Sequence, residues 1–190
     1  MKNKFIKIYN DNFLGNFKII NKSEKTWKVE KLHNNGTKSG IKLNINPEIL
    51  KIVKLERTES SGIIFNYKDK YLFVKQNDGT YSYPKGKIDK GETLKDAAVR
   101  EVEEEISVKF PKSLLPKKYH TLKWFKEFKY KKYNYFIYKL NDSEFVKYFG
   151  KYTLPKEDLQ EQEILWGGFM NYNELQEKLN EKFLPILKHL

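Results

Sequence analysis

The 190-residue chain contains no cysteine. This absence excludes disulfide bonds, thiolate zinc sites, iron–sulfur clusters and a cysteine nucleophile, so we expect no disulfide-linked partner. Long hydrophobic runs are also lacking, since no stretch approaches the roughly 20 apolar residues that a transmembrane helix needs. Lysine and asparagine interrupt the apolar residues at the amino terminus, a pattern that does not predict a signal peptide. We therefore expect a cytoplasmic protein with no membrane partner.

Arginine is scarce although the chain is strongly basic. Arg57 and Arg100 are the only arginines among 37 basic residues, which exceed the 25 acidic residues by 12. Abundant lysine, asparagine and isoleucine are typical of an AT-rich genome, which weakens any argument from lysine number alone. A net charge of +12 nevertheless favours an anionic partner or substrate. Aromatic residues make up 15% of the chain, which predicts a folded protein.

Residues 1–58 and 59–190 differ in pattern. The first part predicts a small, partly β N-terminal extension, because short apolar–polar alternations are separated by Asn/Gly turns. These alternations occupy residues 5–9, 17–20 and 26–29. Asn35-Gly36 is a hairpin signal, and Pro47 predicts the start of a short helix that runs to Ile52.

Residues 59–190 mix strands and helices in irregular order. Strands are predicted at 63–65, 71–74, 81–83, 121–128, 133–140 and 164–169. Helices are predicted at 93–106, 143–148 and 173–182, and a glycine-containing loop at 84–92. This irregular alternation favours an α+β fold or an α/β sandwich.

The helix at 93–106 has the clearest signals. Thr93 is its expected N-cap, and Asp96 lies three residues on, as a capping box requires. At 100° per residue, one face gathers three carboxylates: Glu101, Glu104 and Glu105. Another face, about 140° away, gathers the apolar residues Val99, Val102 and Ile106. The apolar face is expected to pack on a sheet.

A cluster of like charges needs a compensating cation. Carboxylates at i,i+3 and i,i+4 repel one another, and they are the hard oxygen ligands that Mg²⁺ or Mn²⁺ prefers. Arg100 and Glu92 flank the cluster, and a guanidinium can fix the orientation of a carboxylate. The alternative is an ordinary solvated acidic face, which would be the better interpretation of an isolated run of glutamates.

The spacing distinguishes these interpretations. The pattern G-x5-E-x7-R-E-U-x-E-E, with U apolar, resembles the Nudix box. It is formed here by Gly86, Glu92, Arg100, Glu101, Val102, Glu104 and Glu105. One position departs, because Ser107 stands where the family usually has glycine. Val108 matches the apolar residue that follows.

The resemblance implies an α/β/α Nudix sandwich with a mixed sheet over about residues 59–182. It also implies divalent-metal-dependent hydrolysis of a nucleoside diphosphate linked to another group, with Mg²⁺ or Mn²⁺ as cofactor. The implied metal ligands are the Gly86 carbonyl and the side chains of Glu101, Glu104 and Glu105. Arg100 and Glu92 would orient them.

The residues before the helix narrow the resemblance. Tyr83-Pro84-Lys85-Gly86-Lys87 resembles the aromatic–Pro–Lys–Gly–Lys signature of mRNA-decapping Nudix hydrolases. Lys85 and Lys87 are then expected to contact phosphate. Dinucleoside tetraphosphatases also show Pro-Lys-Gly at this place, so that substrate class stays open.

A second resemblance to decapping enzymes lies near the end of the domain, where Glu163-Ile164 is followed by Phe169. In that family the glutamate serves as general base or as an extra metal ligand. Glu163 is therefore the first candidate for the general base, and Glu161 is the second. An exposed loop carboxylate without a catalytic role is the alternative.

Lysines and aromatic residues alternate between positions 117 and 133. Lysines that neutralise phosphates and rings that stack on bases are typical of single-stranded RNA binding. The candidate RNA-binding residues are Lys117, Lys118, Lys123, Lys126, Lys129, Lys131 and Lys132. The interleaved aromatic residues are Tyr119, Trp124, Phe125, Phe128, Tyr130 and Tyr133, and their alternation also fits a strand with its aromatic face in the core. Trp27 is a candidate for stacking on a methylated cap guanine, or else a core residue of the extension.

The sequence as a whole predicts a compact, metal-dependent decapping enzyme that acts on capped mRNA. It would release 7-methylguanosine diphosphate and leave 5′-monophosphate RNA. Because its extension is short and partly β, the chain is more similar to the compact decapping Nudix proteins of large DNA viruses than to cellular decapping enzymes, which carry an all-helical domain. The location would then be the host cytoplasm. Two alternatives remain: hydrolysis of dinucleoside or diphosphoinositol polyphosphates, and a non-catalytic RNA-binding module.

Overall fold

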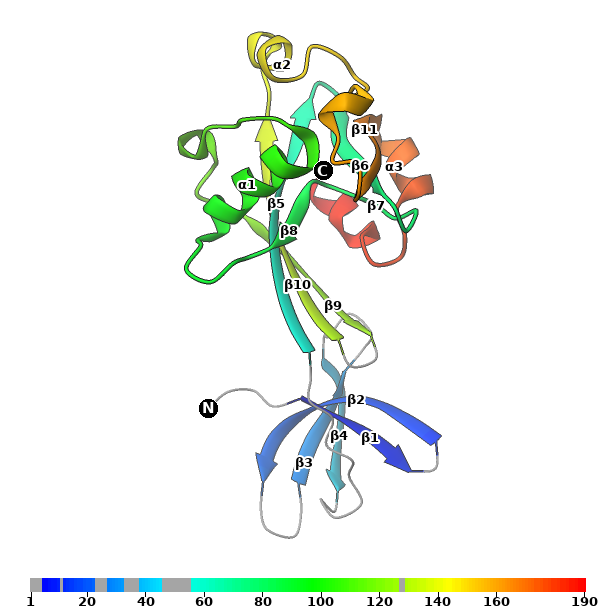
Figure 1. The fold of residues 1–190 in the computed structure, drawn as a ribbon. Coiled ribbons are helices and arrows are strands. Elements are labelled where there is room, and N and C mark those ends of the chain that lie inside the picture. The colour runs from blue at the N-terminus through cyan, green and yellow to red at the C-terminus, as the bar shows by residue number, and fades with distance from the viewer. Residues whose placement is uncertain (1–4, 11, 23–26, 33–37, 46–55, 127–128) are drawn as a thin grey trace. The chain divides into compact units, whose positions relative to one another are not determined.

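The computed structural model describes residues 5–10, 12–22, 27–32, 38–45, 56–126 and 129–190 (Figure 1). The chain separates into two compact units. One unit consists of residues 1–58 with 123–132, and the other of residues 59–122 with 133–190. Segment 123–132 thus groups with the N-terminal unit, whereas the sequence pattern predicts it in the second part of the chain.

The first unit contains a four-stranded antiparallel sheet in the order β1-β2-β3-β4. Its strands are β1 (Phe5–Asn10), β2 (Asn12–Lys22), β3 (Trp27–Leu32) and β4 (Lys38–Ile45). Val29 is fully buried, and its neighbour Glu30 pairs with Lys38 of β4 at 3.5 Å. The predicted hairpin at Asn35-Gly36 and the predicted helix 47–52 lie outside the described residues.

A second sheet has the order β11-β6-β5-β10-β9, with β7 paired to β6 and β8 paired to β5. Its strands are β5 (Glu56–Tyr67), β6 (Lys70–Gln76), β7 (Tyr81–Ser82), β8 (Lys85–Lys87), β9 (His120–Lys126), β10 (Lys129–Lys139) and β11 (Ile164–Asn171). A tight turn at Lys68-Asp69 joins β5 to β6, and a second turn after β6 contains Gly79, which has a φ of 80°.

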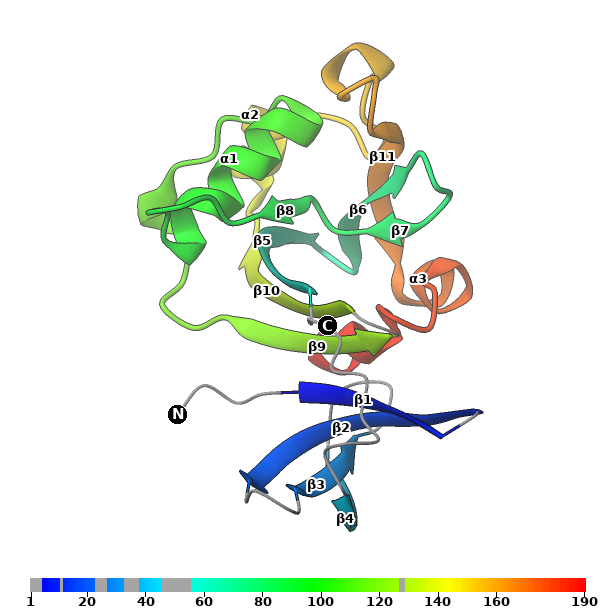
Figure 2. The ribbon, with the colours of Figure 1, turned by 60° about the horizontal axis from the view of Figure 1, so that its bottom comes forward.

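Helices flank this sheet on both sides (Figures 1 and 2). The helices are α1 (Leu94–Ile106), α2 (Asp142–Tyr148) and α3 (Tyr172–Lys178), with 3₁₀ turns η2 (Lys112–Leu114), η3 (Lys156–Asp158) and η4 (Leu184–His189). The predicted α+β fold, a mixed sheet flanked by helices, is confirmed. None of the helices in the described part of the chain is long and apolar enough to cross a bilayer.

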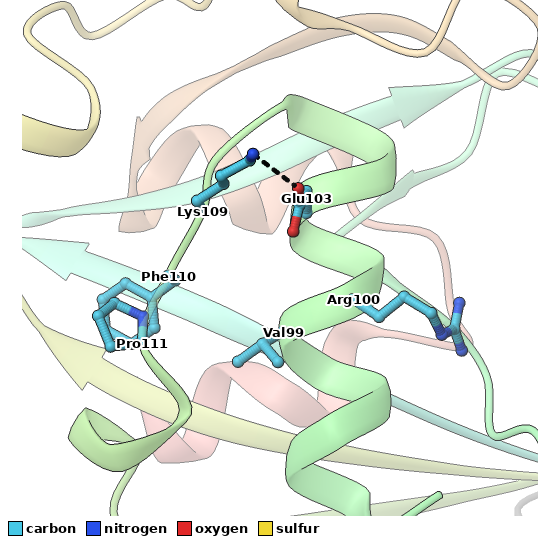
Figure 3. A pocket seen from close by; sticks show the side chains of 6 residues that line it. All are labelled: Val99, Arg100, Glu103, Lys109, Phe110 and Pro111. Atoms are coloured by element: carbon cyan, nitrogen blue, oxygen red, sulfur yellow. Dashed lines mark ion pairs between the residues drawn. The ribbon is translucent and has the colours of Figure 1, made fainter.

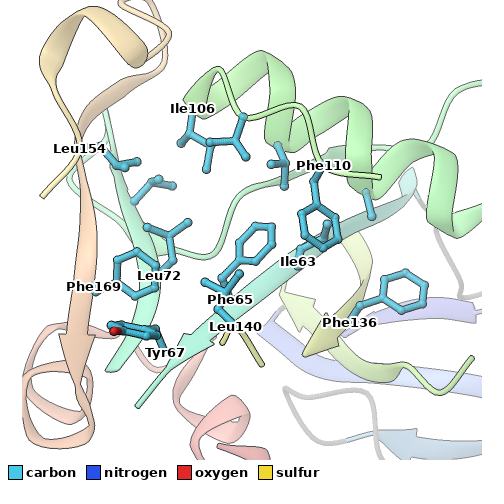
Figure 4. Packing of buried hydrophobic residues seen from close by; sticks show 14 of the residues in the cluster. Ile63, Phe65, Tyr67, Leu72, Ile106, Phe110, Phe136, Leu140, Leu154 and Phe169 are labelled. Atoms are coloured by element: carbon cyan, nitrogen blue, oxygen red, sulfur yellow. The ribbon is translucent and has the colours of Figure 1, made fainter. Parts of the chain in front are cut away.

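The main core lies between α1 and the sheet (Figure 4). Alternate residues of β5 point toward α1, and Ile63 and Phe65 are fully buried there. Ala98, Val102 and Ile106 of α1 pack against them. Fully burying a side chain of this kind stabilises the fold by about 1.5–3 kcal/mol, so α1 is firmly anchored along its apolar face.

A second buried group is centred on the ring of Phe183, which comes just before η4. Its centroid lies 5.2 Å from that of Tyr133 and 6.2 Å from that of Tyr83. Tyr83 and Phe183 are fully buried. The carboxyl-terminal segment therefore closes its side of the sheet with aromatic residues.

Two predicted elements differ from the structure. The predicted loop 84–92 contains β8, whose Gly86 pairs with Ser61 of β5, because the neighbouring strand supplies hydrogen bonds that sequence pattern does not reveal. The predicted helix 173–182 ends at Lys178. Leu179 leaves the helical conformation, and this allows Phe183 to be buried. The free energy gained by burying the Phe183 ring outweighs the helix propensity of the residues before it.

The end of α1 generates a first prediction. Ser107 caps the helix with φ 56° and ψ 22°, a left-handed conformation that glycine adopts without strain. We expect Ser107→Gly to stabilise the protein by about 1 kcal/mol in urea unfolding, because the steric cost of this conformation disappears. Ser107→Ala removes the same hydroxyl but keeps the Cβ, so a similar gain from both variants would contradict this explanation.

A pair of histidines generates a second prediction. The ring centroids of His120 and His189 lie 4.3 Å apart. Burial lowers the pKa of both, and the positive charge of Lys118 adds to that effect. Each ring therefore contributes stability that is present above the unfolded pKa of about 6.5 and is lost as pH falls through the folded pKa.

We therefore expect the melting temperature to fall between pH 7.5 and pH 5.5, and His120→Gln to reduce that fall. Lys118→Gln should reduce it as well, because it removes a charge that disfavours the imidazolium ions. Lys117→Gln is the matched control and should leave the fall unchanged. Equal pH dependence in all four proteins would show that the histidine pair is not responsible.

Candidate active site

Arg100, in the middle of α1, is the centre of a polar cluster. Its Nε and Nη2 atoms donate to the two carboxylate oxygens of Glu92 at 2.8 and 3.0 Å. Its Nη1 donates to Glu101 and to Glu104, both at 2.7 Å. Nη2 also donates to the carbonyl of Lys87 at 2.9 Å. One side chain thus ties the helix to the loop and strand that precede it.

The position of α1 depends on its cap, as the sequence predicted. Thr93 accepts a hydrogen bond from the Asp96 backbone N–H, and Asp96 accepts one from the Thr93 backbone N–H. Lys112 binds the same carboxylate, and these contacts lower the pKa of Asp96 to about 2. The helix therefore begins at a fixed residue, which sets the direction in which each glutamate points.

Glu101 lies directly against Gly86 of β8. A Cβ atom at position 86 would stand 2.0 Å from Glu101 Oε2, so only glycine leaves room for this carboxylate. Burial raises the pKa of Glu101, and the hydrogen bond from Arg100 opposes that rise. The spacing from Gly86 to Glu101 thus has a steric explanation: β8 and α1 meet at a glycine.

Glu105 is almost completely buried, with 2% of its surface exposed. Its Oε2 accepts a hydrogen bond from the Lys85 backbone N–H at 3.3 Å. Burial raises the pKa of Glu105 well above its ordinary value, and the charge of Glu101 adds to that effect while Lys85 opposes it. A nearby cation would therefore stabilise this carboxylate in its ionised form.

The three glutamates do not share one environment. The side chain of Glu104 is 51% exposed, whereas Glu101 and Glu105 point inward toward β8. Burial thus differs within the predicted carboxylate face, because Glu104 lies at its solvent-facing edge. Arg100 still holds Glu104 beside Glu101 through the shared Nη1 donor.

Glu163 lies near Glu105 although 58 residues separate them in sequence. The loop before β11 is attached to the end of α1, since the Gln160 N–H donates to the Glu105 carbonyl at 3.1 Å. The Glu163 carbonyl accepts from the Asn77 N–H at 2.9 Å, and the charge of Glu163 raises the pKa of Glu105. Glu163 is exposed, and so is Glu161.

The donor set is suited to a hard divalent cation. Glu101 and Glu105 are carboxylates brought into a poorly hydrated place, where their mutual repulsion favours a cation between them. Within the described residues, however, no three acidic or histidine side chains converge on one point. Glu104 is half exposed and can change rotamer without disturbing the core, so the chemistry of the site fits the metal that the sequence predicts.

The two predicted phosphate-binding lysines differ in environment. Lys85 is buried, and its Nζ lies 5.8 Å from the centroid of Phe183. Lys87 is exposed. Sequence reasoning missed Lys182, whose Nζ lies 4.5 Å from the same ring, because no motif marks the carboxyl-terminal segment.

The predicted RNA-binding lysines are divided between the two units. Lys117 and Lys118 are exposed residues of the second unit. Those in the first unit are Lys123, which is exposed, and Lys131 and Lys132, which are half-buried. The side chains of Lys126, Lys129 and Trp27 lie outside the described residues. Tyr133 is a core residue with 4% exposure, so its ring is not available to stack on a base.

A surface hollow of about 460 Å³ lies on a different side of α1. It is lined by Val99, Arg100, Glu103, Lys109, Phe110 and Pro111. Figure 3 shows the guanidinium of Arg100 pointing away from Phe110 and Pro111. The hollow therefore contains none of the predicted metal ligands and shares only Arg100 with the candidate active site.

The contact between β8 and α1 generates a third prediction. We expect Gly86→Ala to weaken Mn²⁺ binding by about 10- to 100-fold in isothermal titration, because the added Cβ displaces the Glu101 carboxylate. Lys87→Ala alters the next residue of the same strand without touching that carboxylate and serves as the control. Equal Mn²⁺ affinity in Gly86→Ala and wild type, with both folded, would contradict the assignment of Glu101 as a ligand.

Comparison with known proteins agrees with this geometry. The model of the NUDIX domain family matches residues 56–190. A binary complex of the C. elegans Ap4A hydrolase superposes with a TM-score of 0.51 and 20% identity, over 69% of this chain and 93% of that one. The MutT protein of Methanosarcina mazei Go1 gives a TM-score of 0.54 and 14% identity, over 72% and 94%.

A third solved structure, the MutT NUDIX hydrolase of Burkholderia pseudomallei, gives a TM-score of 0.54 and 14% identity, over 71% of this chain and 98% of that one. At such identities the superpositions establish the fold alone. The family match extends over well more than half of the chain and includes every residue of the glutamate cluster. The protein belongs to the Nudix hydrolase family.

Proposed function

We propose that the protein is a metal-dependent pyrophosphohydrolase that removes the 5′ cap of mRNA. The reaction would release 7-methylguanosine diphosphate and leave RNA with a 5′-monophosphate. The observation that carries the hydrolytic part is the cluster in which Arg100 orients Glu101 and Glu104 beside the buried Glu105. Nudix hydrolases generally use divalent metals such as Mg²⁺ or Mn²⁺, and this cluster supplies oxygen ligands for one.

In this proposal Glu101, Glu104, Glu105 and the Gly86 carbonyl hold the metal. Once bound, the metal neutralises charge on the phosphate oxygens and lowers the pKa of water. Arg100 keeps the carboxylates in place, and its bidentate contact with Glu92 fixes the guanidinium in turn. If the bidentate contact between Arg100 and Glu92 were lost, the guanidinium would no longer hold the other glutamates in place, and their charges would repel one another.

Glu163 is the proposed general base. Its exposed carboxylate lies on the loop that is hydrogen-bonded to the end of α1, so it is close to Glu105 and accessible to water. As a water oxygen attacks the phosphorus, its proton passes to Glu163 and the bond from phosphorus to the bridging oxygen breaks. Lys85 and Lys87 would balance the charge of the phosphates on either side.

Three features support capped RNA as the substrate. Tyr83-Pro84-Lys85-Gly86-Lys87 resembles the signature of decapping Nudix enzymes. The net charge of +12 suits a polyanion, and exposed lysines such as Lys117, Lys118 and Lys123 can neutralise phosphates along a strand. A cap guanine would need an aromatic partner, for which Trp27 is our candidate.

The proposal is tested with RNA radiolabelled in its cap phosphates, with Mg²⁺ or Mn²⁺ present. Free cap dinucleotide, diadenosine tetraphosphate and diphosphoinositol phosphates serve as competing substrates. We expect release of 7-methylguanosine diphosphate, faster from long RNA than from the free cap. Turnover of the small polyphosphates with capped RNA untouched would retain the Nudix chemistry and refute decapping.

Glu105→Gln is the matched inactive variant for this assay. We expect it to lower the hydrolysis rate by at least about 100-fold, because a neutral amide cannot replace a carboxylate ligand. Its affinity for RNA, measured in EDTA, should stay near that of the wild type. Equal hydrolysis by the two proteins would refute the metal site, and no hydrolysis by either, with tight RNA binding, would indicate a non-catalytic RNA-binding module.

A further inference from the structure

A row of half-buried side chains crosses three strands on the side of the sheet near α3. The strand register pairs Trp166 of β11 with Lys75 of β6, and Lys75 with Tyr81 of β7. Paired residues of neighbouring strands present their side chains on the same face. The centroids of Trp166 and Tyr81 lie 6.2 Å apart, with their planes at 61°. The row therefore places two aromatic rings and one ammonium group together.

The indole of Trp166 lies where a side chain at position 168 would be, because residue 168 is glycine. A Cβ atom on Gly168, two residues further along β11, would stand 2.6 Å from Trp166 Cζ2 and 2.8 Å from Cη2. The ring thus lies along the strand above a glycine and remains only half buried. Its orientation is fixed by the backbone beneath it while part of its surface stays open to a ligand.

Positive charge lies beside the ring of Tyr81. The Nζ atoms of Lys75 and Lys178 both lie 5.8 Å from the centroid of Tyr81. Trp166, Tyr81 and Lys75 are half exposed, and Lys178 is exposed. Aromatic surface for a base, with ammonium groups for a phosphate beside it, is the combination that binds nucleotide units.

The row is connected to the candidate active site. Trp166 lies three residues after Glu163, which is about 10 Å along an extended strand. The turn between β6 and β7 is bound to the same loop, since the Asn77 N–H donates to the Glu163 carbonyl at 2.9 Å. Asp78 in that turn has its pKa lowered by hydrogen bonds from Thr80 and, to a smaller extent, by the charges of Lys182 and Lys85.

We propose that Trp166, Tyr81, Lys75 and Lys178 form a binding surface for one nucleotide unit of the substrate, outside the phosphoanhydride that is cleaved. The base would stack on the exposed indole or phenol ring, and its phosphate would lie against Lys75 or Lys178. This inference rests on the proposed function in one respect, that the substrate contains a nucleotide. The unit is either a residue of an RNA strand or the second nucleoside of a dinucleoside polyphosphate.

The test measures binding without turnover. A fluorescein-labelled, 5′-monophosphorylated RNA 12-mer and a fluorescent diadenosine tetraphosphate are titrated with protein in EDTA, and binding is followed by anisotropy. We expect Trp166→Ala to weaken binding of one or both probes by about 10-fold, because a stacked base is lost. Trp166→Phe should recover most of the affinity, since it restores an aromatic surface.

Leu165→Ala is the matched control. Leu165 is the neighbouring residue of β11, is 54% exposed and lies at the register shift between Ile164 and Trp166, where it is paired with no residue of β6. It should bind both probes like the wild type. If Trp166→Ala is too unstable to purify, Lys75→Gln gives a second test, in which affinity falls and the salt dependence of binding becomes shallower.

Comparison of the RNA probe with the diadenosine tetraphosphate probe identifies the source of the nucleotide. Weaker binding of the RNA alone would assign the surface to the strand, and weaker binding of both probes would assign it to the nucleoside next to the polyphosphate. Unchanged binding of both probes in folded Trp166→Ala and Lys75→Gln would overturn the proposal and leave Trp166 as a cover for the edge strand. Because no hydrolysis is involved, this result is independent of whether capped RNA is the true substrate.

Discussion

The five hydrogen bonds of the Arg100 guanidinium hold the candidate active site together. They join Glu92 and the Lys87 carbonyl, which precede α1, to Glu101 and Glu104 within it. Charge-assisted hydrogen bonds of this kind are about twice as strong as neutral ones, and the planar fork sets direction as well as distance. Without this cation, three glutamates on two turns of one helix would repel one another.

Burial gives the site its chemical character. Glu105 is enclosed beneath β8 and accepts a hydrogen bond from the Lys85 backbone, so its charge is poorly solvated. Such a carboxylate destabilises the protein by itself, and a cation bound beside it would stabilise it and thereby couple its binding to the stability of α1. Gly86 makes the arrangement possible, because any side chain there would occupy the position of Glu101.

The lysines around Phe183 extend this electrostatic pattern away from the glutamates. Lys85 and Lys182 both have their ammonium groups over or beside that buried ring. Lys85 belongs to β8, and its charge opposes the rise in the pKa of the buried Glu105. A polyphosphate with a metal at one end and ammonium groups along its length matches this distribution of charge.

Much of the fold and of the glutamate cluster could be predicted from local sequence. The Thr93–Asp96 capping box defined where α1 begins, and the spacing from Gly86 to Glu105 predicted both the Nudix family and the carboxylates. Such signals are reliable because capping and helical periodicity depend on residues only a few positions apart. The carboxyl-terminal helix was predicted too long, since the burial of Phe183 is a tertiary effect that propensity does not contain.

The sequence by itself therefore determined which residues could do the chemistry, namely Arg100 and the glutamates at fixed helical spacing. Only the tertiary structure decided their environments, with Glu105 buried and Glu104 half exposed on what the sequence presented as one face. Only the strand register brought Trp166, Lys75 and Tyr81 into one row, and only the docking of the loop at 160–163 placed Glu163 near Glu105. The reason is physical: helix periodicity is local, whereas strand pairing and burial depend on segments that are distant along the chain.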